Sequence, residues 1–75
     1  MAATAQRSFA RSLYGEASVK DAVEAFADFA KIELVETEDG WTLTLQDVDE
    51  DFEPEVLASE LANYVLASTI DRRRS

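Results

Sequence analysis

The stretch that decides the fold covers residues 31–47 and reads KIELVETEDGWTLTLQD. Apolar and polar side chains alternate on both sides of Asp39-Gly40, which is the pattern of two half-buried strands joined by a tight turn. Because Asp-Gly suits the two central positions of a type I′ turn, the sequence predicts a two-residue loop there. That loop places Leu34 opposite Leu45 in an antiparallel pair.

One face of this predicted hairpin is apolar, and the other is polar. The apolar face comprises five side chains: Ile32, Leu34, Trp41, Leu43 and Leu45. The opposite face carries mostly Glu, Thr and Gln, together with Val35. A shift of one residue would bring charged side chains into the core, so we expect the pattern itself to fix the register. The hairpin therefore needs a covering layer on one side only.

Two amphipathic segments flank the hairpin and supply that layer. Residues 19–30 place apolar side chains at steps of three and four, so we expect a helix of about 13 residues there. Ser18 is its expected cap, and Asp21 completes a capping box. A second helix begins near Pro54, which suits a first turn, and the charges of Arg72–Arg74 favour its C-terminus.

The N-terminal segment carries weaker signals. Residues 7–14 have a faint strand pattern, with Phe9 and Leu13 on one face. Residues 1–6 are small and polar, and we expect a disordered N-terminus there. The predicted organisation is therefore a single small α+β domain at 7–75. Its element order is β-α-β-β-α, with two helices packed on one face of a two- or three-stranded sheet.

Composition excludes several classes of function. The 75 residues hold 16 Asp and Glu against 7 Lys and Arg, a net charge of −9, which disfavours binding to a nucleic-acid backbone. The chain has no His and no Cys, so it lacks the usual zinc ligands and thiol nucleophile. It shows no signal-peptide pattern and no membrane-spanning run, so a cytoplasmic protein is expected. We expect neither an enzyme nor a bound cofactor.

The acidic block at residues 47–55 invites comparison with a calcium-binding loop. It lacks the glycine that such a loop needs for its sharp turn, and Pro54 interrupts the spacing. Charges that favour the N-terminus of the following helix are the simpler interpretation, so we predict no metal site. The arginines at 72–74 have a similarly structural interpretation at the other end of that helix.

A small sheet with helices on one face leaves at least one edge open. An open edge accepts a further strand through backbone hydrogen bonds, either from a second copy or from an extended peptide. The residues that we assign to a partner interface are Phe9, Leu13, Tyr14, Val35, Phe52, Asn63 and Ile70. The alternative, that the apolar residues among them only complete a monomer core, stays open at this point.

Three stretches carry a resemblance to a known family: Ser12-Leu13-Tyr14, VKDAVEAFADF at 19–29, and ELANYVL at 60–66, which includes Asn63. Over roughly residues 10–72 the chain resembles the HxsD-like family, small proteins associated with radical-SAM systems that mature His-Xaa-Ser repeat peptides. The resemblance implies an accessory role in peptide modification, with the chemistry done by a separate iron–sulfur enzyme. It supplies no catalytic residue.

The leading hypothesis is a non-catalytic accessory or adaptor domain. It would bind a precursor peptide or a partner enzyme, such as a radical-SAM enzyme, through a sheet edge and adjoining apolar residues. One alternative is an obligate homodimer or small oligomer with a structural role. Another is an acidic nucleic-acid mimic that binds a basic protein. None of these hypotheses has a nucleic acid or a membrane as the ligand.

Overall fold

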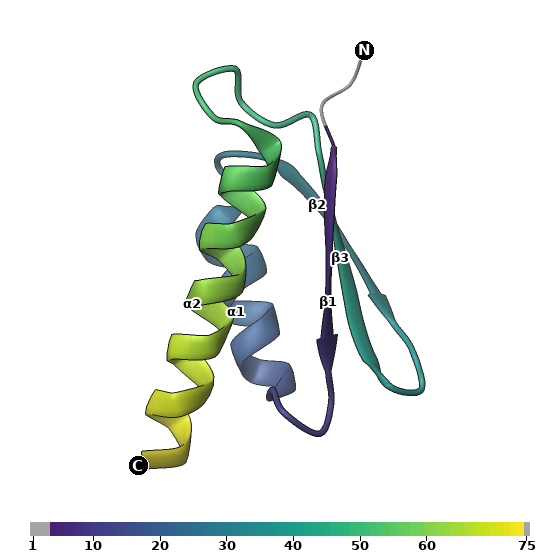
Figure 1. Cartoon of the computed structure of the whole chain (residues 1–75), viewed down its shortest axis with the longest axis vertical. Coiled ribbons are helices and arrows are strands. Elements are labelled where there is room, and N and C mark those ends of the chain that lie inside the picture. The colour runs from purple at the N-terminus through teal and green to yellow at the C-terminus, as the bar shows by residue number, and fades with distance from the viewer. Residues whose placement is uncertain (1–3, 75) are drawn as a thin grey trace.

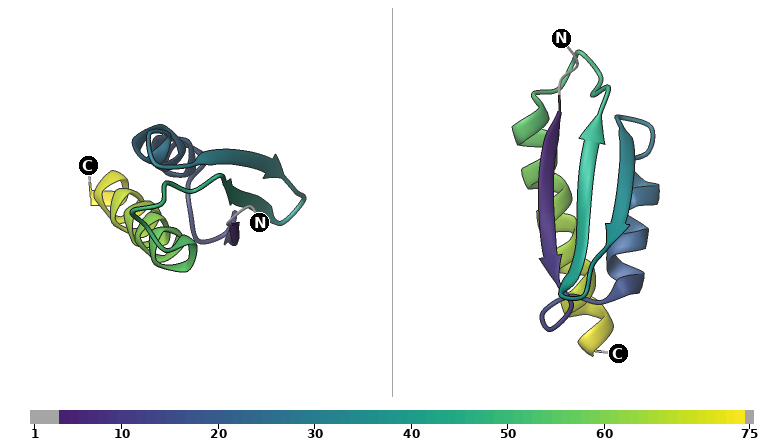
Figure 2. Two further views of the ribbon diagram at one scale, coloured as in Figure 1. Left: turned by 90° about the horizontal axis from the view of Figure 1, so that it is seen from above. Right: turned by 90° about the vertical axis from the view of Figure 1, so that its right-hand side faces the viewer.

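The computed structural model describes residues 4–74 and shows a two-layer α+β fold (Figures 1 and 2). Its elements, in chain order, are β1 (Ala5–Ala10), α1 (Glu16–Phe26), β2 (Lys31–Glu36), β3 (Gly40–Gln46) and α2 (Pro54–Arg74). The strands form an antiparallel sheet in the order β1-β3-β2, and both helices lie on one face of it. The predicted class and element order are confirmed, and the sheet has three strands.

The hairpin of β2 and β3 differs in register from the sequence prediction by two residues. Thr37 and Gly40 form the closing pair, with N–H···O distances of 2.7 and 3.3 Å, and the two residues between them make the loop. Leu34 consequently lies opposite Leu43 instead of the predicted Leu45. Because two residues are a full strand period, each side chain keeps its predicted face.

The shift in register follows from the close approach of β1 to the turn. A Cβ atom on Gly40 would lie 1.9 Å from the Phe9 carbonyl oxygen and 2.9 Å from the Arg11 amide nitrogen. Since only glycine permits this approach, Gly40 is the first residue of β3, paired with Ala10, and not a loop residue. The Arg11 N–H also donates to the Asp39 carbonyl at 2.7 Å. The sequence of the hairpin alone does not show these contacts with β1, and so it does not determine the register.

β1 begins inside the segment that the sequence predicts to be disordered. Ala5 is 5% exposed and lies opposite Leu45, so pairing with the central strand orders this end of the sheet. The prediction for residues 1–6 is therefore wrong for Ala5 and Gln6, which belong to β1. Residues 1–3 lie outside the described residues.

β1 also ends before the predicted strand does. The Ala10 carbonyl accepts hydrogen bonds of 3.0 Å from the amides of both Leu13 and Tyr14, and the chain turns toward α1. The predicted common face of Phe9 and Leu13 is therefore wrong, because Leu13 has left the sheet. The Tyr14 ring packs edge-on against Phe9, with 5.3 Å between the ring centroids.

α1 begins before Ser18, so the predicted capping role of Ser18 is wrong. Gly15 is the N-cap, and Ser18 lies in the first turn of the helix, where it is fully buried. Its hydroxyl oxygen pairs with the Ser68 hydroxyl of α2 at 3.1 Å. Packing between the helices thus decides the environment of Ser18, and the predicted capping box with Asp21 does not form. The helix also ends earlier than predicted, at Phe26.

The core lies between the sheet and the two helices. β3 contributes Trp41, Leu43 and Leu45, each of which is at most 3% exposed. The helices contribute the following buried side chains: Val19, Ala22, Leu57, Ala58, Leu61 and Val65. Leu34 lies at the margin of this core and is 36% exposed, because β2 is an edge strand. The face of the sheet away from the helices has no covering layer among the described residues (Figure 2).

Candidate partner interface

One side of α2 faces β1 and the loop that follows β1. The residues on this side follow at steps of three and four: Glu55, Ser59, Ala62, Leu66, Ile70 and Arg73. At one end, the Arg7 guanidinium of β1 donates to the Glu55 carboxylate at 2.9 Å and to the Ser59 hydroxyl at 3.4 Å. At the other end, the Arg73 guanidinium donates to the Leu13 carbonyl oxygen at 2.9 Å. These contacts place the residues between them beside the open edge of β1.

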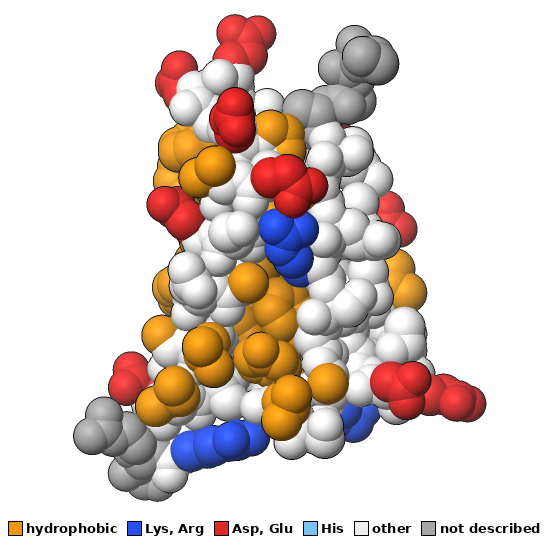
Figure 3. Space-filling view, viewed as in Figure 1, with side chains coloured by type: hydrophobic (Ala, Val, Ile, Leu, Met, Phe, Trp, Pro, Cys, Tyr) orange, Lys and Arg blue, Asp and Glu red, His pale blue; other side chains and the backbone are white. Residues whose placement is uncertain are grey.

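The apolar part of this region is called the β1–α2 surface here and comprises Leu13, Tyr14, Ala62, Leu66 and Ile70. Leu13 is 59% exposed, Leu66 is 46% exposed and Ile70 is 47% exposed. Figure 3 shows apolar side chains gathered between α2 and β1, with basic side chains above and below them. Large apolar side chains that remain exposed together in one region are typical of an interaction surface.

β1 is an edge strand, and part of its backbone is directed away from the sheet. The Phe9 carbonyl points toward Gly40 of β3, and peptide groups alternate in direction along an antiparallel strand. The N–H and C=O groups of Gln6 and Ser8 therefore point to the open side. The Gln6 carbonyl accepts a hydrogen bond of 2.9 Å from Arg7, whereas the Ser8 groups are placed to pair with an added strand.

Basic residues border this surface in a chain that is acidic as a whole. They come from β1, from the loop after it and from the end of α2: Arg7, Arg11, Arg72 and Arg73. Arg11 pairs with Glu36 at 2.8 Å, and its guanidinium lies 4.7 Å from the centroid of the Trp41 ring. Stacking of this kind holds the cation in place at low entropic cost. Four of the seven Lys and Arg residues thus lie on the β1 side of the fold, and three of the four pair with carboxylates: Arg7 with Glu55, Arg11 with Glu36, and Arg72 with Asp21.

One exposed ion pair shifts the pKa values of both its members. The Glu16 carboxylate and the Lys20 ammonium, one turn apart on α1, are 2.8 Å apart. The hydrogen bond from Lys20, aided by its charge, lowers the pKa of Glu16 below the ordinary value. The same hydrogen bond raises the pKa of Lys20. Glu16 is the one acidic residue in the first turn of α1, and its carboxylate is therefore engaged in an ion pair.

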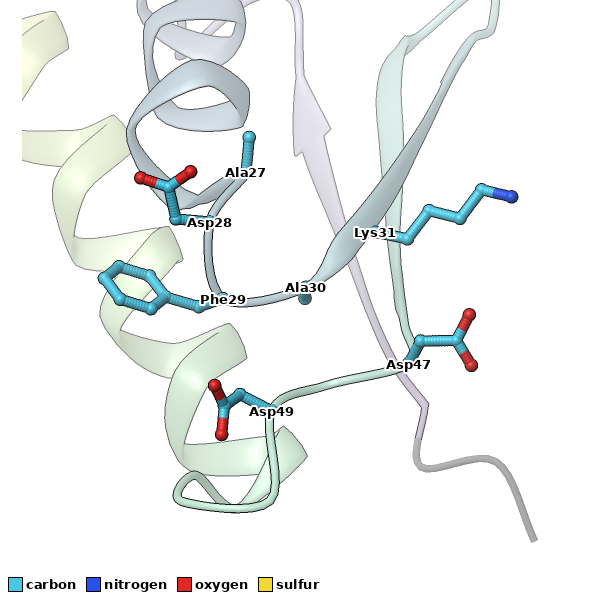
Figure 4. Close-up of a pocket in the computed structure, with 7 residues that line it drawn as sticks. All are labelled: Ala27, Asp28, Phe29, Ala30, Lys31, Asp47 and Asp49. Atoms are coloured by element: carbon cyan, nitrogen blue, oxygen red, sulfur yellow. The ribbon is translucent and has the colours of Figure 1, made fainter.

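A shallow, open depression of about 480 Å³ lies beside the acidic loop (Figure 4). Seven residues line it: Ala27, Asp28, Phe29, Ala30, Lys31, Asp47 and Asp49. In Figure 4 the Asp47 carboxylate extends to the same side as Lys31, away from those of Asp28 and Asp49. The carboxylates do not converge, and within residues 4–74 no group of three or more is placed to hold a metal ion.

The acidic loop has an ordered backbone, to which its own side chains contribute. The Asp49 N–H donates to the Phe29 carbonyl at 2.8 Å, and its side chain accepts a hydrogen bond of 3.0 Å from the Asp51 amide. Asp47 adopts a positive φ of 49°, a conformation that Asp tolerates better than most residues. These contacts support a structural interpretation of the acidic block.

The seven residues predicted for a partner interface lie in several places. Leu13, Tyr14 and Ile70 meet at the β1–α2 surface. Phe9 is 4% exposed and lies in the core beneath that surface, so its assignment to an exposed interface is wrong. The alternation of β1 turns Phe9 toward the helices, where it pairs across the strands with Trp41.

The remaining predicted interface residues are separate from this surface. Val35 lies on the uncovered face of the sheet and is 46% exposed. Phe52 is half-buried against Phe29, with ring centroids 5.2 Å apart, beside the acidic loop. Asn63 is exposed on α2, next in sequence to Ala62 of the β1–α2 surface. The seven residues predicted for one interface therefore lie on both faces of the sheet and at one end of the molecule.

The predicted interface did not include four residues of this region: Arg7, Ala62, Leu66 and Arg73. Leu66 lies in the broad apolar arc of α2, together with Leu57, Leu61, Tyr64 and Val65, so its spacing alone does not distinguish it from a core residue. The broad apolar arc of that helix was the one available signal, since a helix on a single sheet buries only one stripe. Strand alternation places Arg7 on the same side of β1 as Phe9, but its partner Glu55, 48 residues away, was not predictable from the sequence.

A second group of exposed apolar residues lies where the end of α1 meets α2. Phe26 contacts both Phe29 and Tyr64, with ring centroids 6.3 and 5.8 Å apart in edge-to-face geometry. Phe29 is 38% exposed and Tyr64 is 41% exposed. These rings pack edge-to-face against one another, so much of their apolar surface area is already buried within the chain.

Comparisons with known proteins identify no relative of this chain. No protein-family model matches the chain, and no curated protein or solved structure matches it either. The resemblance to the HxsD-like family therefore stays a prediction. Neither helix of the described residues combines the length and the apolar composition needed to cross a bilayer.

Proposed function

We propose that this chain is a non-catalytic accessory or adaptor domain that binds an extended, acidic segment of a partner. The bound segment adds a strand to the sheet at the edge of β1, and its inward side chains pack on the β1–α2 surface. The observation that carries the proposal is an open strand edge lying beside exposed apolar side chains, those of Leu13, Leu66 and Ile70.

The geometry of β1 supports strand addition at this edge. Phe9 faces the helices, and neighbouring strands of a sheet turn equivalent side chains to the same face. Every second side chain of an added strand therefore faces α2, where Leu66 and Ile70 offer apolar contact. Backbone pairing supplies affinity, and these contacts supply selectivity for the side chains that face inward.

Charge favours β1 over β2 as the edge that binds, and it favours an acidic occupant. Arg7 and Arg73 lie at the two ends of the β1–α2 surface. β2, by contrast, carries one cation, Lys31, and two carboxylates, Glu33 and Glu36, the second of which pairs with Arg11. It leads into the hairpin turn, which consists of Glu38 and Asp39. In a chain with a net charge of −9, complementarity directs a negatively charged segment to the basic side.

The resemblance to the HxsD-like family supports a particular source for this segment. The proposed partner is a precursor peptide or the radical-SAM enzyme of a peptide-maturation system, and the proposed location is the cytoplasm. Co-purification of the tagged chain with both candidates, expressed together, tests this finer proposal. Retention of neither candidate contradicts the assignment to peptide maturation and leaves strand addition to be judged by the next experiment.

A displayed library of short random peptides tests strand addition directly. Selected peptides are measured by fluorescence anisotropy against the parent protein, Leu66→Asp and Val35→Asp. Val35 is a matched control, because both residues are 46% exposed and gain the same charge. We expect peptides with alternating apolar and acidic residues, and a loss of about tenfold or more for Leu66→Asp only. Ser8→Pro, which removes an outward N–H from β1, weakens binding in the same way.

The opposite pattern contradicts the proposal. If Val35→Asp abolishes binding and Leu66→Asp does not, the uncovered sheet face is the binding surface. Light scattering across a range of concentrations tests the alternative of a homodimer. A dimer that Leu66→Asp converts to a monomer would make a second copy the occupant of this surface, in place of a partner peptide.

A further inference from the structure

An aromatic patch joins the end of α1 to α2 and to the loop that precedes α2. Phe26 contacts Tyr64 and Phe29, and Phe29 contacts Phe52 with 5.2 Å between the ring centroids. Phe29 is 38% exposed and Tyr64 is 41% exposed, so the outer surface of these rings still meets solvent. The aromatic patch, defined as these four residues, is therefore an apolar surface that no other described residue covers.

Carboxylates border the aromatic patch. The Asp49 N–H donates to the Phe29 carbonyl at 2.8 Å, which holds the acidic loop beside the patch. Asp28, Phe29 and Asp49 line the same shallow depression, and Figure 4 shows the Phe29 ring between the two carboxylate side chains. On α2, a step of four residues places Glu60 one turn before Tyr64 on the same side of the helix. None of the three carboxylates has a cationic partner among the described side chains.

The chain itself offers little positive charge to this region. No Lys or Arg occurs in residues 32–71, which include the acidic loop and most of α2. Lys31 is the cation nearest in sequence, and in Figure 4 its side chain extends away from Phe29. In Figure 3, acidic side chains gather over the loop before α2, whereas the basic side chains of that face lie beside β1 and at the end of α2. Carboxylates and the face of an aromatic ring both attract cations, so this surface favours a positively charged ligand.

The secondary structure around the patch favours a helix as the bound segment. The patch lies on two helices and a loop, and the backbone groups inside a helix are already paired with one another. A segment bound here receives no row of backbone hydrogen bonds, unlike a strand added at β1, so it must satisfy its own. An amphipathic helix does so, and it presents apolar side chains on one face and charged side chains beside them.

We propose that the aromatic patch binds a basic amphipathic helix of a partner protein. The apolar face of that helix packs on the rings of the patch, and its Lys or Arg side chains pair with Asp28, Asp49 and Glu60. A second copy of this chain brings its own net negative charge to the same carboxylates and is therefore a poorer fit. The surface is distinct from the one proposed for strand addition, because Tyr64 and Leu66 lie on opposite sides of α2.

A synthetic peptide of Leu and Lys, with Leu at steps of three and four, is the probe. Its control is a scrambled peptide of the same composition, which has the same charge but no apolar face. We expect the amphipathic peptide to bind the full chain about tenfold or more tightly than the scrambled one in fluorescence anisotropy. The ¹H–¹⁵N NMR signals of residues 26–30 and 60–64 should shift most. Equal binding of the two peptides, or shifts spread over all the acidic residues, overturns the proposal.

Two double variants separate a local effect from one of net charge. Asp28→Asn combined with Glu60→Gln is expected to weaken binding of the amphipathic peptide by about tenfold or more. Glu33→Gln combined with Glu38→Gln makes the same change of charge on the hairpin and should leave binding unchanged at physiological ionic strength. All four side chains are exposed, so the substitutions preserve the core. Undiminished binding in the first variant, or equal losses in both, overturns the proposal.

A third pair of variants distinguishes this surface from the β1–α2 surface. Tyr64→Ser is expected to weaken binding of the amphipathic peptide by about tenfold, whereas Leu66→Ser, at a similarly exposed position, should leave it unchanged. The acidic peptides of the strand-addition test should show the reverse dependence, so either proposal can fail without the other. A loss for Leu66→Ser only overturns the present one. Shifts of the patch signals on raising the protein concentration alone would make a second copy the occupant and overturn it as well.

Discussion

The most demanding test of the fold is Gly40→Ala. The new Cβ atom would lie 1.9 Å from the Phe9 carbonyl oxygen, whereas real Cβ contacts essentially never fall below 3.0 Å. β1 must therefore retreat by more than 1 Å from β3 at this end, because the opposing atoms belong to the backbone and cannot rotate away. Retreat strains the pairing of Ala10 with Gly40 and the hydrogen bond from Arg11 to Asp39.

The expected loss for Gly40→Ala is about 3 kcal/mol, the upper part of the range for overpacked sites. A domain of 75 residues has a total stability of about 4–11 kcal/mol, so this loss is a large fraction of it. The midpoint of thermal unfolding should fall by about 12–24 °C, at about 4–8 °C for each kcal/mol. Far-UV circular dichroism during heating, and urea unfolding at 25 °C, measure the two quantities.

Gly15→Ala is the matched control for Gly40→Ala. Gly15 has an ordinary φ of −94°, and nothing lies within 4 Å of a Cβ atom placed there. Its expected change is below about 1 kcal/mol, because a weaker cap and a less flexible unfolded chain offset each other. A Gly40→Ala protein within about 0.5 kcal/mol of the parent would refute the close approach of β1 to the turn. Equal losses in the two variants would refute the assignment of the effect to Gly40.

Three further outcomes follow from the packing and the charges. Leu61→Ala, at a fully buried position, should cost about 2–5 kcal/mol in urea unfolding, and a cost no larger than that of Leu66→Ala would contradict the burial described for α2. Thr69→Val should raise stability by about 1 kcal/mol, because it removes a buried hydroxyl without a hydrogen-bond partner; a loss would show that the hydroxyl has a partner. The lowered pKa of Glu16 means that its contribution to stability is present above its unfolded pKa and is lost as pH falls through the folded pKa. Lys20→Gln should return that pKa, measured by NMR, toward its ordinary value, and an unchanged pKa would contradict the pairing.

Local patterns were sufficient for much of this fold. Alternation in residues 31–47 and steps of three and four in residues 19–30 identify the hairpin and the first long helix, because each period reflects which side of one element is buried. The same reasoning placed Leu43 on the buried face correctly even though the predicted register was wrong. A register error of two residues leaves the faces unchanged, so the pattern by itself could not detect it.

The candidate site was only partly predictable, because its residues come together through contacts between distant segments. Leu13 and Ile70 were identified as surplus apolar residues, but nothing in the sequence shows that they meet. Leu66 reads as a core residue until the side of α2 beside β1 is known, and Phe9 reads as an interface residue until β1 pairs with β3. Arg73 borders the β1–α2 surface because its guanidinium donates to the Leu13 carbonyl, 60 residues away in the chain.

Residue order alone thus established the class, the order of the elements and the buried face of the hairpin, since these depend on interactions within one helix or one pair of adjacent strands. Assembly of the layers determined the register at Gly40, the burial of Ser18 and the surface between β1 and α2. Each of these depends on an atom from a remote segment, such as the Phe9 carbonyl or the Ser68 hydroxyl. Periodicity carries no information about such contacts, because it describes one element and not its neighbour.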